Sequence, residues 1–124
     1  MSRKIILTGG KFNSVHKGHV WFLKKARKLG YLVVVLANDI RNKRAYAVSA
    51  RKRKKAIEEL KIADKVVVGS RKSFVKVVKE YRPNIIVLGY DQKLPDKKTK
   101  DYIRKNKINV VRFGKHGSYS TRGL

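Results

Sequence analysis

The sequence predicts an α/β fold, an open sheet of five parallel strands with helices on both faces. Short blocks rich in valine and isoleucine alternate with longer stretches of helical period, which is the pattern of a parallel sheet. The blocks are apolar almost throughout, as strands covered on both faces are. The 124 residues, 42% of them hydrophobic, suffice for one domain with a core of ordinary size, and we expect residues 1–124 to form it.

The elements follow one another in strict alternation. Five strands are predicted from the apolar blocks: Ile5–Thr8, Leu32–Ala37, Lys65–Val68, Ile85–Leu88 and Val110–Phe113. Four helices are predicted between them: Gly18–Leu29, Ala50–Leu60, Ser73–Tyr81 and Lys97–Lys105. Gly30 is the expected C-cap of the first helix, and Ser49 and Ser73 are expected N-caps. Pro83 ends the third helix, because proline cannot continue it.

The charge of the chain is strongly unbalanced. Against 33 lysines and arginines stand 8 acids, for a formal net charge of +25. The acids all lie between Asp39 and Asp101, so both ends are purely basic. Such a balance predicts an anionic ligand, with nucleic acid as a first candidate. The densest run, Arg51–Lys55, has no interleaved aromatic residues, and a solvated helix face is the favoured interpretation over a phosphate-facing patch.

The chain has no cysteine, which excludes a disulfide framework, a thiolate zinc site and a cysteine nucleophile. The strongly apolar run Ile5-Ile6-Leu7 after the basic start is far shorter than the ~20 residues that a spanning helix needs. It is also too short for the core of a signal peptide. We therefore expect a soluble, cytoplasmic protein with no contact to a membrane.

A segment rich in glycine and histidine joins the first predicted strand to the first predicted helix: Thr8-Gly9-Gly10-Lys11-Phe12-Asn13-Ser14-Val15-His16-Lys17-Gly18-His19. A turn of this kind offers free backbone N–H groups and a helix N-terminus to a phosphate. The two histidines are three residues apart, so both imidazoles project to one side. The pattern is neither a dinucleotide fingerprint nor a P-loop, and no carboxylate or cysteine lies nearby in sequence to complete a metal site.

The stretch from Gly10 to His19 resembles the Gly-x-Phe-Asp-x-x-His-x-Gly-His signature of the cytidylyltransferase-like nucleotidyltransferases. Class I aminoacyl-tRNA synthetases share the His-x-Gly-His part of it. Asn13 stands where the signature most often has aspartate. The resemblance extends to further segments: Ala37-Asn38-Asp39, residues 61–69, Val87-Leu88-Gly89-Tyr90-Asp91-Gln92 and Ser120-Thr121-Arg122. The last two are most similar to archaeal FAD synthases, with glycerol-3-phosphate cytidylyltransferases next.

The resemblance implies a Rossmann-like sheet in which the first and fourth strands are neighbours, so that loops 9–19 and 89–92 face one crevice. It implies transfer of a nucleotidyl group from a nucleoside triphosphate to a phosphorylated acceptor, with ATP and FMN giving FAD as the first expectation. The alternatives are a CTP-dependent cytidylyltransferase for a polyol phosphate such as glycerol 3-phosphate and, from another class, a basic nucleic-acid-binding module. Mg²⁺ or another divalent cation is expected on the triphosphate, without a dedicated protein site. Relatives of this kind are often homodimers.

The resemblance, together with the need for cations to offset the repulsion between two polyanions, assigns expected roles to individual residues. The expected catalytic residues are His16, His19 and Lys43. The expected nucleotide-binding residues are Gly9, Gly10, Lys11, Phe12, Lys17, Gly18, Gly89, Tyr90, Asp91, Ser120 and Thr121. The expected acceptor-binding residues are Asp39, Arg44, Lys115 and Arg122. For Lys43 and Arg44 a solvated loop is an equally weighted alternative.

Overall fold

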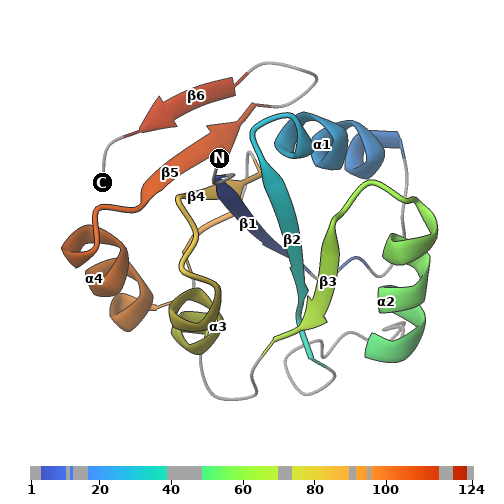
Figure 1. The fold of residues 1–124 in the computed structure, drawn as a ribbon, viewed down its shortest axis with the longest axis horizontal. Helices are drawn as coiled ribbons and strands as arrows, with labels where there is room; N and C mark the ends of the chain where they lie inside the picture. The colour runs from blue at the N-terminus through green and yellow to red at the C-terminus, as the bar shows by residue number, and fades with distance from the viewer. Residues whose placement is uncertain are drawn as a thin grey trace.

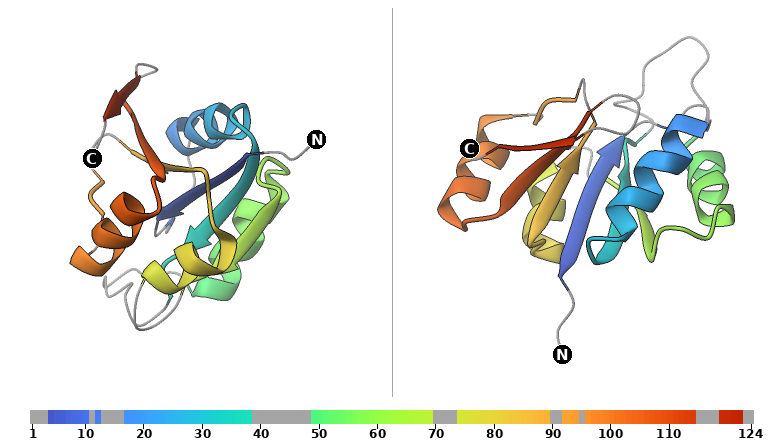
Figure 2. Two further views of the ribbon diagram at one scale, coloured as in Figure 1. Left: turned by 60° about the vertical axis from the view of Figure 1, so that its left-hand side comes forward. Right: turned by 90° about the horizontal axis from the view of Figure 1, so that it is seen from above.

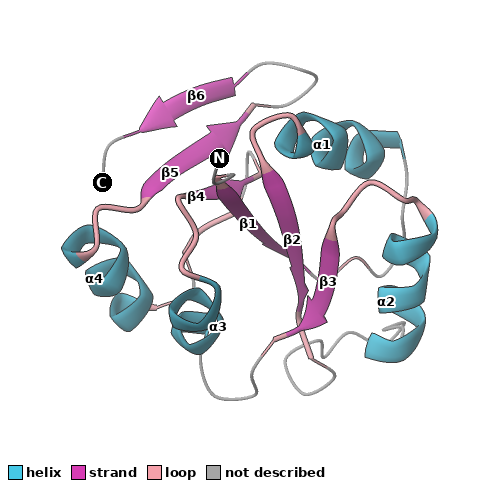
Figure 3. Ribbon diagram, viewed as in Figure 1, coloured by secondary structure: helices cyan, strands magenta, loops and turns pink. Residues whose placement is uncertain are grey.

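A computed structural model describes residues 4–10, 12, 17–38, 49–69, 74–89, 92–94 and 96–114, and the backbone of residues 119–122 (Figure 1). Strands and helices alternate along the chain, except that the last two elements are both strands (Figure 3). The strands are β1 (Ile5–Gly10), β2 (Tyr31–Leu36), β3 (Lys65–Val68), β4 (Ile85–Leu88), β5 (Asn109–Phe113) and β6 (Tyr119–Arg122). The helices are α1 (Lys17–Arg27), α2 (Ala50–Glu59), α3 (Phe74–Tyr81) and α4 (Lys97–Lys105).

The strands form one sheet in the order β3-β2-β1-β4-β5-β6, and the first five of them are parallel. This confirms the predicted five-stranded parallel sheet and its Rossmann-like order, with β1 beside β4. The prediction missed β6, which pairs antiparallel with β5 at the edge of the sheet (Figure 2). Its sequence, Tyr-Ser-Thr-Arg, lacks the apolar block that predicted the other strands.

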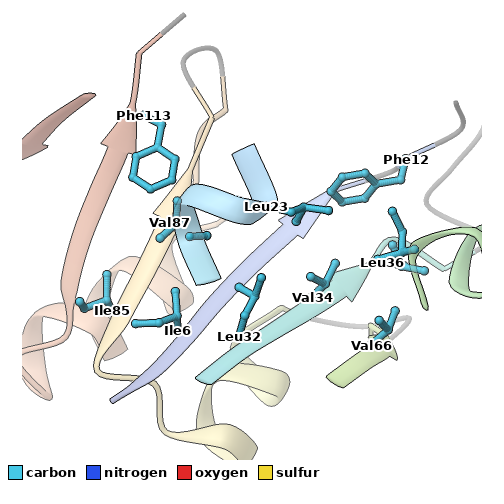
Figure 4. Close-up of a cluster of buried hydrophobic side chains, with 12 residues drawn as sticks. Ile6, Phe12, Leu23, Leu32, Val34, Leu36, Val66, Ile85, Val87 and Phe113 are labelled. Atoms are coloured by element: carbon cyan, nitrogen blue, oxygen red, sulfur yellow. The ribbon is translucent and has the colours of Figure 1, made fainter. Parts of the chain in front are cut away.

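The core has two halves, one on each face of the sheet, because successive strand residues point to opposite faces. Figure 1 shows α1 and α2 together on one side of the sheet and α3 and α4 on the other. The first half (Figure 4) comprises Ile6, Phe12, Leu23, Ala26, Leu32, Val34, Leu36, Ile57, Val66, Ile85, Val87 and Phe113. The second comprises Leu7, Val33, Val35, Val77, Val78, Ile86, Leu88, Ile103 and Val110. Helices on both faces explain why the strand blocks are apolar almost throughout.

The predicted element boundaries lie within two residues of the observed ones. Ser49 caps α2 as expected, because its side chain accepts from the Lys52 backbone N–H at 3.4 Å. The assignment of Gly30 as C-cap was wrong, since α1 ends at Arg27. A Cβ at Gly30 would lie 2.3 Å from the carbonyl oxygen of Lys4, so a close approach of two backbones requires glycine there. Ser73 lies outside the described residues.

The basic run of α2 is mostly a solvated face. Arg51, Lys52 and Lys55 are exposed, in agreement with the favoured interpretation. Arg53 differs, because it is 1% exposed and shares the inward face of the helix with Ala50 and Ile57. The run therefore contains one core-facing arginine among surface cations.

Candidate active site at the carboxyl edge of the sheet

The strand order reverses between β1 and β4. From β1 the chain runs to α1 on one face, and from β4 it runs to α4 on the other face. In open parallel sheets, ligands bind beyond the carboxyl ends of the strands at such a reversal. Of the predicted nucleotide-binding residues, Gly9 and Gly10 end β1 and Gly89 directly follows β4, so the topology brings these three to the reversal.

Phe12 anchors the loop after β1 to the core. Its backbone adopts a positive φ of 52°, and its ring is 9% exposed against the core beside Leu23 and Leu36 (Figure 4). A Cβ at Gly10 would lie 2.7 Å from Cε2 of this ring. Glycine at position 10 therefore lets the Phe12 ring fold back over the strand end. The Gly10 carbonyl accepts from the Ala37 backbone N–H at 2.9 Å, which ties the loop to the end of β2.

His19 lies in the first turn of α1, directly after the exposed residues Lys17 and Gly18. Its ring is half-buried and tilted by 57° against the Phe12 ring, with the ring centroids 5.1 Å apart. The buried Phe12 therefore holds the imidazole next to the end of β1. The N-terminal end of α1 lies in the same place, and the positive end of a helix dipole favours an anion.

Two side chains join the ends of β1 and β4. The buried hydroxyl of Thr8 donates to the Val87 carbonyl at 2.8 Å. Beyond this point, the side-chain amide of Gln92 accepts from the Gly89 N–H at 2.6 Å and donates to the Gly9 carbonyl at 2.8 Å. Both glycines were predicted to bind nucleotide, and one amide side chain connects their backbones.

Arg112 on β5 supports the same loop from the next strand. Its guanidinium donates to the Gly89 carbonyl at 2.8 Å and also to the Gln92 carbonyl. Sequence reasoning did not single out the side chains of Gln92 and Arg112. For Gln92 a signal existed, since an amide three residues after a glycine can reach back to its N–H. For Arg112 there was none, because its partners lie in the segment after β4, 23 and 20 residues away in the sequence.

Several predicted site residues lie outside the described part of the chain: Lys11, His16, Asp39, Lys43, Arg44, Tyr90, Asp91 and Lys115. Of Ser120, Thr121 and Arg122 the structure describes the backbone, which pairs with β5. Ser120 lies opposite Arg112, and Arg122 lies opposite Val110, two positions further from the carboxyl edge. The strand that the sequence missed therefore places the backbone of Ser120 near the carboxyl edge of the sheet, with β5 between it and β4.

Comparison with known proteins supports the family suggested by the signature. The family model described as cytidylyltransferase-like matches residues 7–120. The chain is 41% identical to an FAD synthase of Aciduliprofundum boonei, over 95% of this chain and 83% of that protein. It is 36% identical to an FAD synthase of Methanohalophilus mahii, over 89% of this chain and 81% of that protein.

A solved structure has the same architecture over the whole chain. The crystal structure of the lipopolysaccharide core biosynthesis protein from Thermoplasma volcanium GSS1 superposes with a TM-score of 0.77 at 32% identity. The match covers 98% of this chain and 100% of that chain. Signature, strand order and relatives agree, and this chain belongs to the cytidylyltransferase-like family.

Proposed function

We propose that the chain is an FAD synthase, an adenylyltransferase that joins the AMP portion of ATP to FMN and releases pyrophosphate. The family match and the relatives make it a nucleotidyltransferase of the FAD synthase type. The observation that carries the proposal is the similarity to proteins named FAD synthase, at 41% identity over 83% of the first of them. The strand order is consistent with the proposal, because its reversal between β1 and β4 is where open parallel sheets bind ligands.

The reaction is a displacement at the α-phosphorus of ATP. An oxygen of the FMN phosphate forms a bond to that phosphorus, while the bond from the phosphorus to the α–β bridging oxygen breaks. Pyrophosphate leaves with the electron pair of the broken bond, and no covalent enzyme intermediate is required. Catalysis then consists of aligning two polyanions and stabilising the charge that develops on the phosphoryl oxygens.

The roles proposed for the described residues follow from their positions. His19 donates a hydrogen bond to phosphoryl oxygens, because it lies in the first turn of α1 beside the end of β1. The N–H groups of that turn, preceded by the glycines of β1, cradle the triphosphate. Lys17, exposed at the start of α1, offsets part of the negative charge.

Further roles are proposed for residues outside the described part, by resemblance to the family and from their charge. We propose that His16 and Lys43 act in catalysis, that Lys11, Tyr90 and Asp91 bind the nucleotide, and that Asp39, Arg44 and Lys115 bind the acceptor. Ser120 and Thr121 are proposed for the triphosphate and Arg122 for the acceptor on the same ground.

Mg²⁺ is proposed as the companion of the triphosphate. Among the described residues, no group of three or more histidines or carboxylates could hold a metal ion. In the proposal the ion binds mainly through phosphate oxygens. When bound, it would neutralise part of the charge on the leaving pyrophosphate.

A CTP-dependent transfer to a polyol phosphate is the alternative within the same chemistry. The two are separated by one assay in which the chain receives ATP or CTP, with FMN or glycerol 3-phosphate as acceptor. We expect FAD and pyrophosphate from ATP and FMN. Formation of a CDP-polyol in place of FAD would replace the proposal with the alternative.

We propose a cytoplasmic site of action, where ATP and FMN are available. None of the helices in the described ranges has the length and apolar character needed to cross a membrane. Assembly into a homodimer remains a prediction that a sedimentation measurement would test.

A further inference from the structure

We propose that Gln92 is a positioning residue that sets the spacing between the two strand ends at which the nucleotide binds. The inference rests on the proposed function, since it concerns the strand ends at which that reaction is proposed to take place. It is carried by the bridge that the Gln92 amide makes between Gly89 and Gly9, residues that lie 80 positions apart in the chain.

The bridge takes over where direct pairing of β1 with β4 stops. The register of these strands runs through Ile6 with Ile85 and Leu7 with Ile86 to Thr8 with Val87. One residue further along β1, the carbonyl of Gly9 accepts from the Gln92 side chain at 2.8 Å. A side chain thus stands between the two backbones and separates the strand ends at the carboxyl edge.

The amino edge of the same strand pair is closed differently. There, Asn84 directly precedes β4, and its backbone N–H donates to the Ile5 carbonyl at 2.8 Å. Its side-chain oxygen accepts from the Ile5 N–H, also at 2.8 Å. The backbones are thus in direct contact at the amino edge and are spaced by an amide at the carboxyl edge. The spacing occurs at the edge where the switch point places the ligand.

The bridge requires an amide in one orientation. Its oxygen accepts from Gly89 N–H and its nitrogen donates to Gly9 C=O, so both polar ends are used. Backbone hydrogen bonds hold this segment in place. The backbone N–H of Gln92 donates to the Gly89 carbonyl at 3.2 Å, and Arg112 donates to the backbone carbonyls of both residues. A Cβ at Gly89 would lie 3.2 Å from the Gln92 oxygen, so glycine permits this close approach.

The test is Gln92→Glu in the full-length chain. A carboxylate keeps the acceptor for Gly89 but faces the Gly9 carbonyl with a second acceptor, so the strand ends move apart. We expect the KM for ATP to rise about tenfold, because the variant loses the hydrogen bond to the Gly9 carbonyl and leaves that carbonyl without its donor. The ratio of variant to wild-type kcat/KM should recover as the pH falls toward the carboxyl pKa of about 4.3, because the protonated acid donates again.

The matched control is Asn84→Asp, which places a carboxylate between the same two strands at the opposite edge and keeps its acceptor for Ile5. Its KM for ATP should stay within twofold of wild type. Gln92→Met, which keeps the length and loses both bonds, serves as second variant if Gln92→Glu does not fold. A lower Tm with an unchanged KM in the position-92 variants would overturn the proposal, because the bridge would then be structural alone.

The nucleotide-induced rise in Tm separates this inference from the proposed function. If the wild-type chain makes no FAD but is stabilised by ATP or CTP, the proposed function is wrong. A smaller nucleotide-induced rise in Tm in Gln92→Glu would then still support the positioning role of Gln92. Equal stabilisation of variant and wild type would reject the role of Gln92 while leaving the reaction in place. A wild-type chain that responds to no nucleotide would overturn both.

Discussion

At the scale of single residues, the sequence signature at the end of β1 predicts a binding role for Gly10 and Phe12 but not their packing. The sequence predicted a phosphate-binding turn with glycines that admit a ligand. The structure shows a further reason for glycine at position 10, since a Cβ there would lie 2.7 Å from the Phe12 ring and clash with it. Phe12, expected to bind nucleotide through its backbone, is 9% exposed and a core residue through its side chain. Sequence could not separate these roles, because packing of a loop residue on its own strand has no periodicity.

His19 supplies a prediction at this scale. The variant His19→Phe keeps a ring against Phe12 and removes the nitrogen donors. We expect kcat to fall about 10²- to 10³-fold, the usual loss for a donor that stabilises developing phosphoryl charge. The KM for ATP should change little, because binding relies mainly on backbone groups.

The Tm of His19→Phe, measured alongside its steady-state kinetics, is the control, and it should stay near that of wild type. A variant with wild-type kcat would show that His19 packs against Phe12 and takes no part in the reaction.

At the scale of elements, the parallel strands were predictable because strands covered on both faces form apolar blocks. Ser49 before α2 and Pro83 after α3 helped to place those two helices. The exception is β6, whose polar sequence has no apolar block and which pairs with β5 at the edge of the sheet. Helix α2 shows a second limit. Arg53 lies within a run of surface cations, and its burial at 1% exposure depends on the inward face it shares with Ile57.

The two faces of α2 should respond differently to truncation. Ile57 is fully buried against the sheet, so Ile57→Ala should lower the free energy of unfolding by about 2–5 kcal/mol. Lys55 is exposed, and Lys55→Ala should change it by less than about 0.5 kcal/mol. Urea unfolding followed by circular dichroism measures both. Equal effects of the two substitutions would contradict the placement of α2 on the sheet.

At the scale of the whole molecule, the net charge of +25 exceeds what the proposed site uses. The described acids include Asp64, paired with Arg27 at 2.9 Å, and Asp101, paired with Arg104 at 2.7 Å. The sequence holds 8 acids against 33 lysines and arginines, so positive charge is in large excess over the whole chain. Nucleic-acid binding, the alternative from another class, stays a prediction based on this excess charge.

Self-repulsion among these cations should make the stability depend on salt. Raising KCl from about 0.01 to 0.15 M shortens the screening length from about 30 to 8 Å, so repulsion weakens and the Tm should rise. The double variant Lys52→Glu/Lys55→Glu reduces the repulsion directly and should show a smaller rise. Calorimetry across the salt series checks this, and a Tm that falls with salt in both proteins would contradict it.

Transfer of AMP from ATP to FMN at the carboxyl edge of the sheet is tested by incubating the wild-type chain with ATP, Mg²⁺ and FMN. FAD and pyrophosphate are quantified over time. We expect equal amounts of the two products, with their rate strongly reduced in His19→Phe. Release of no FAD across a panel of divalent metals, from a folded chain, would contradict it.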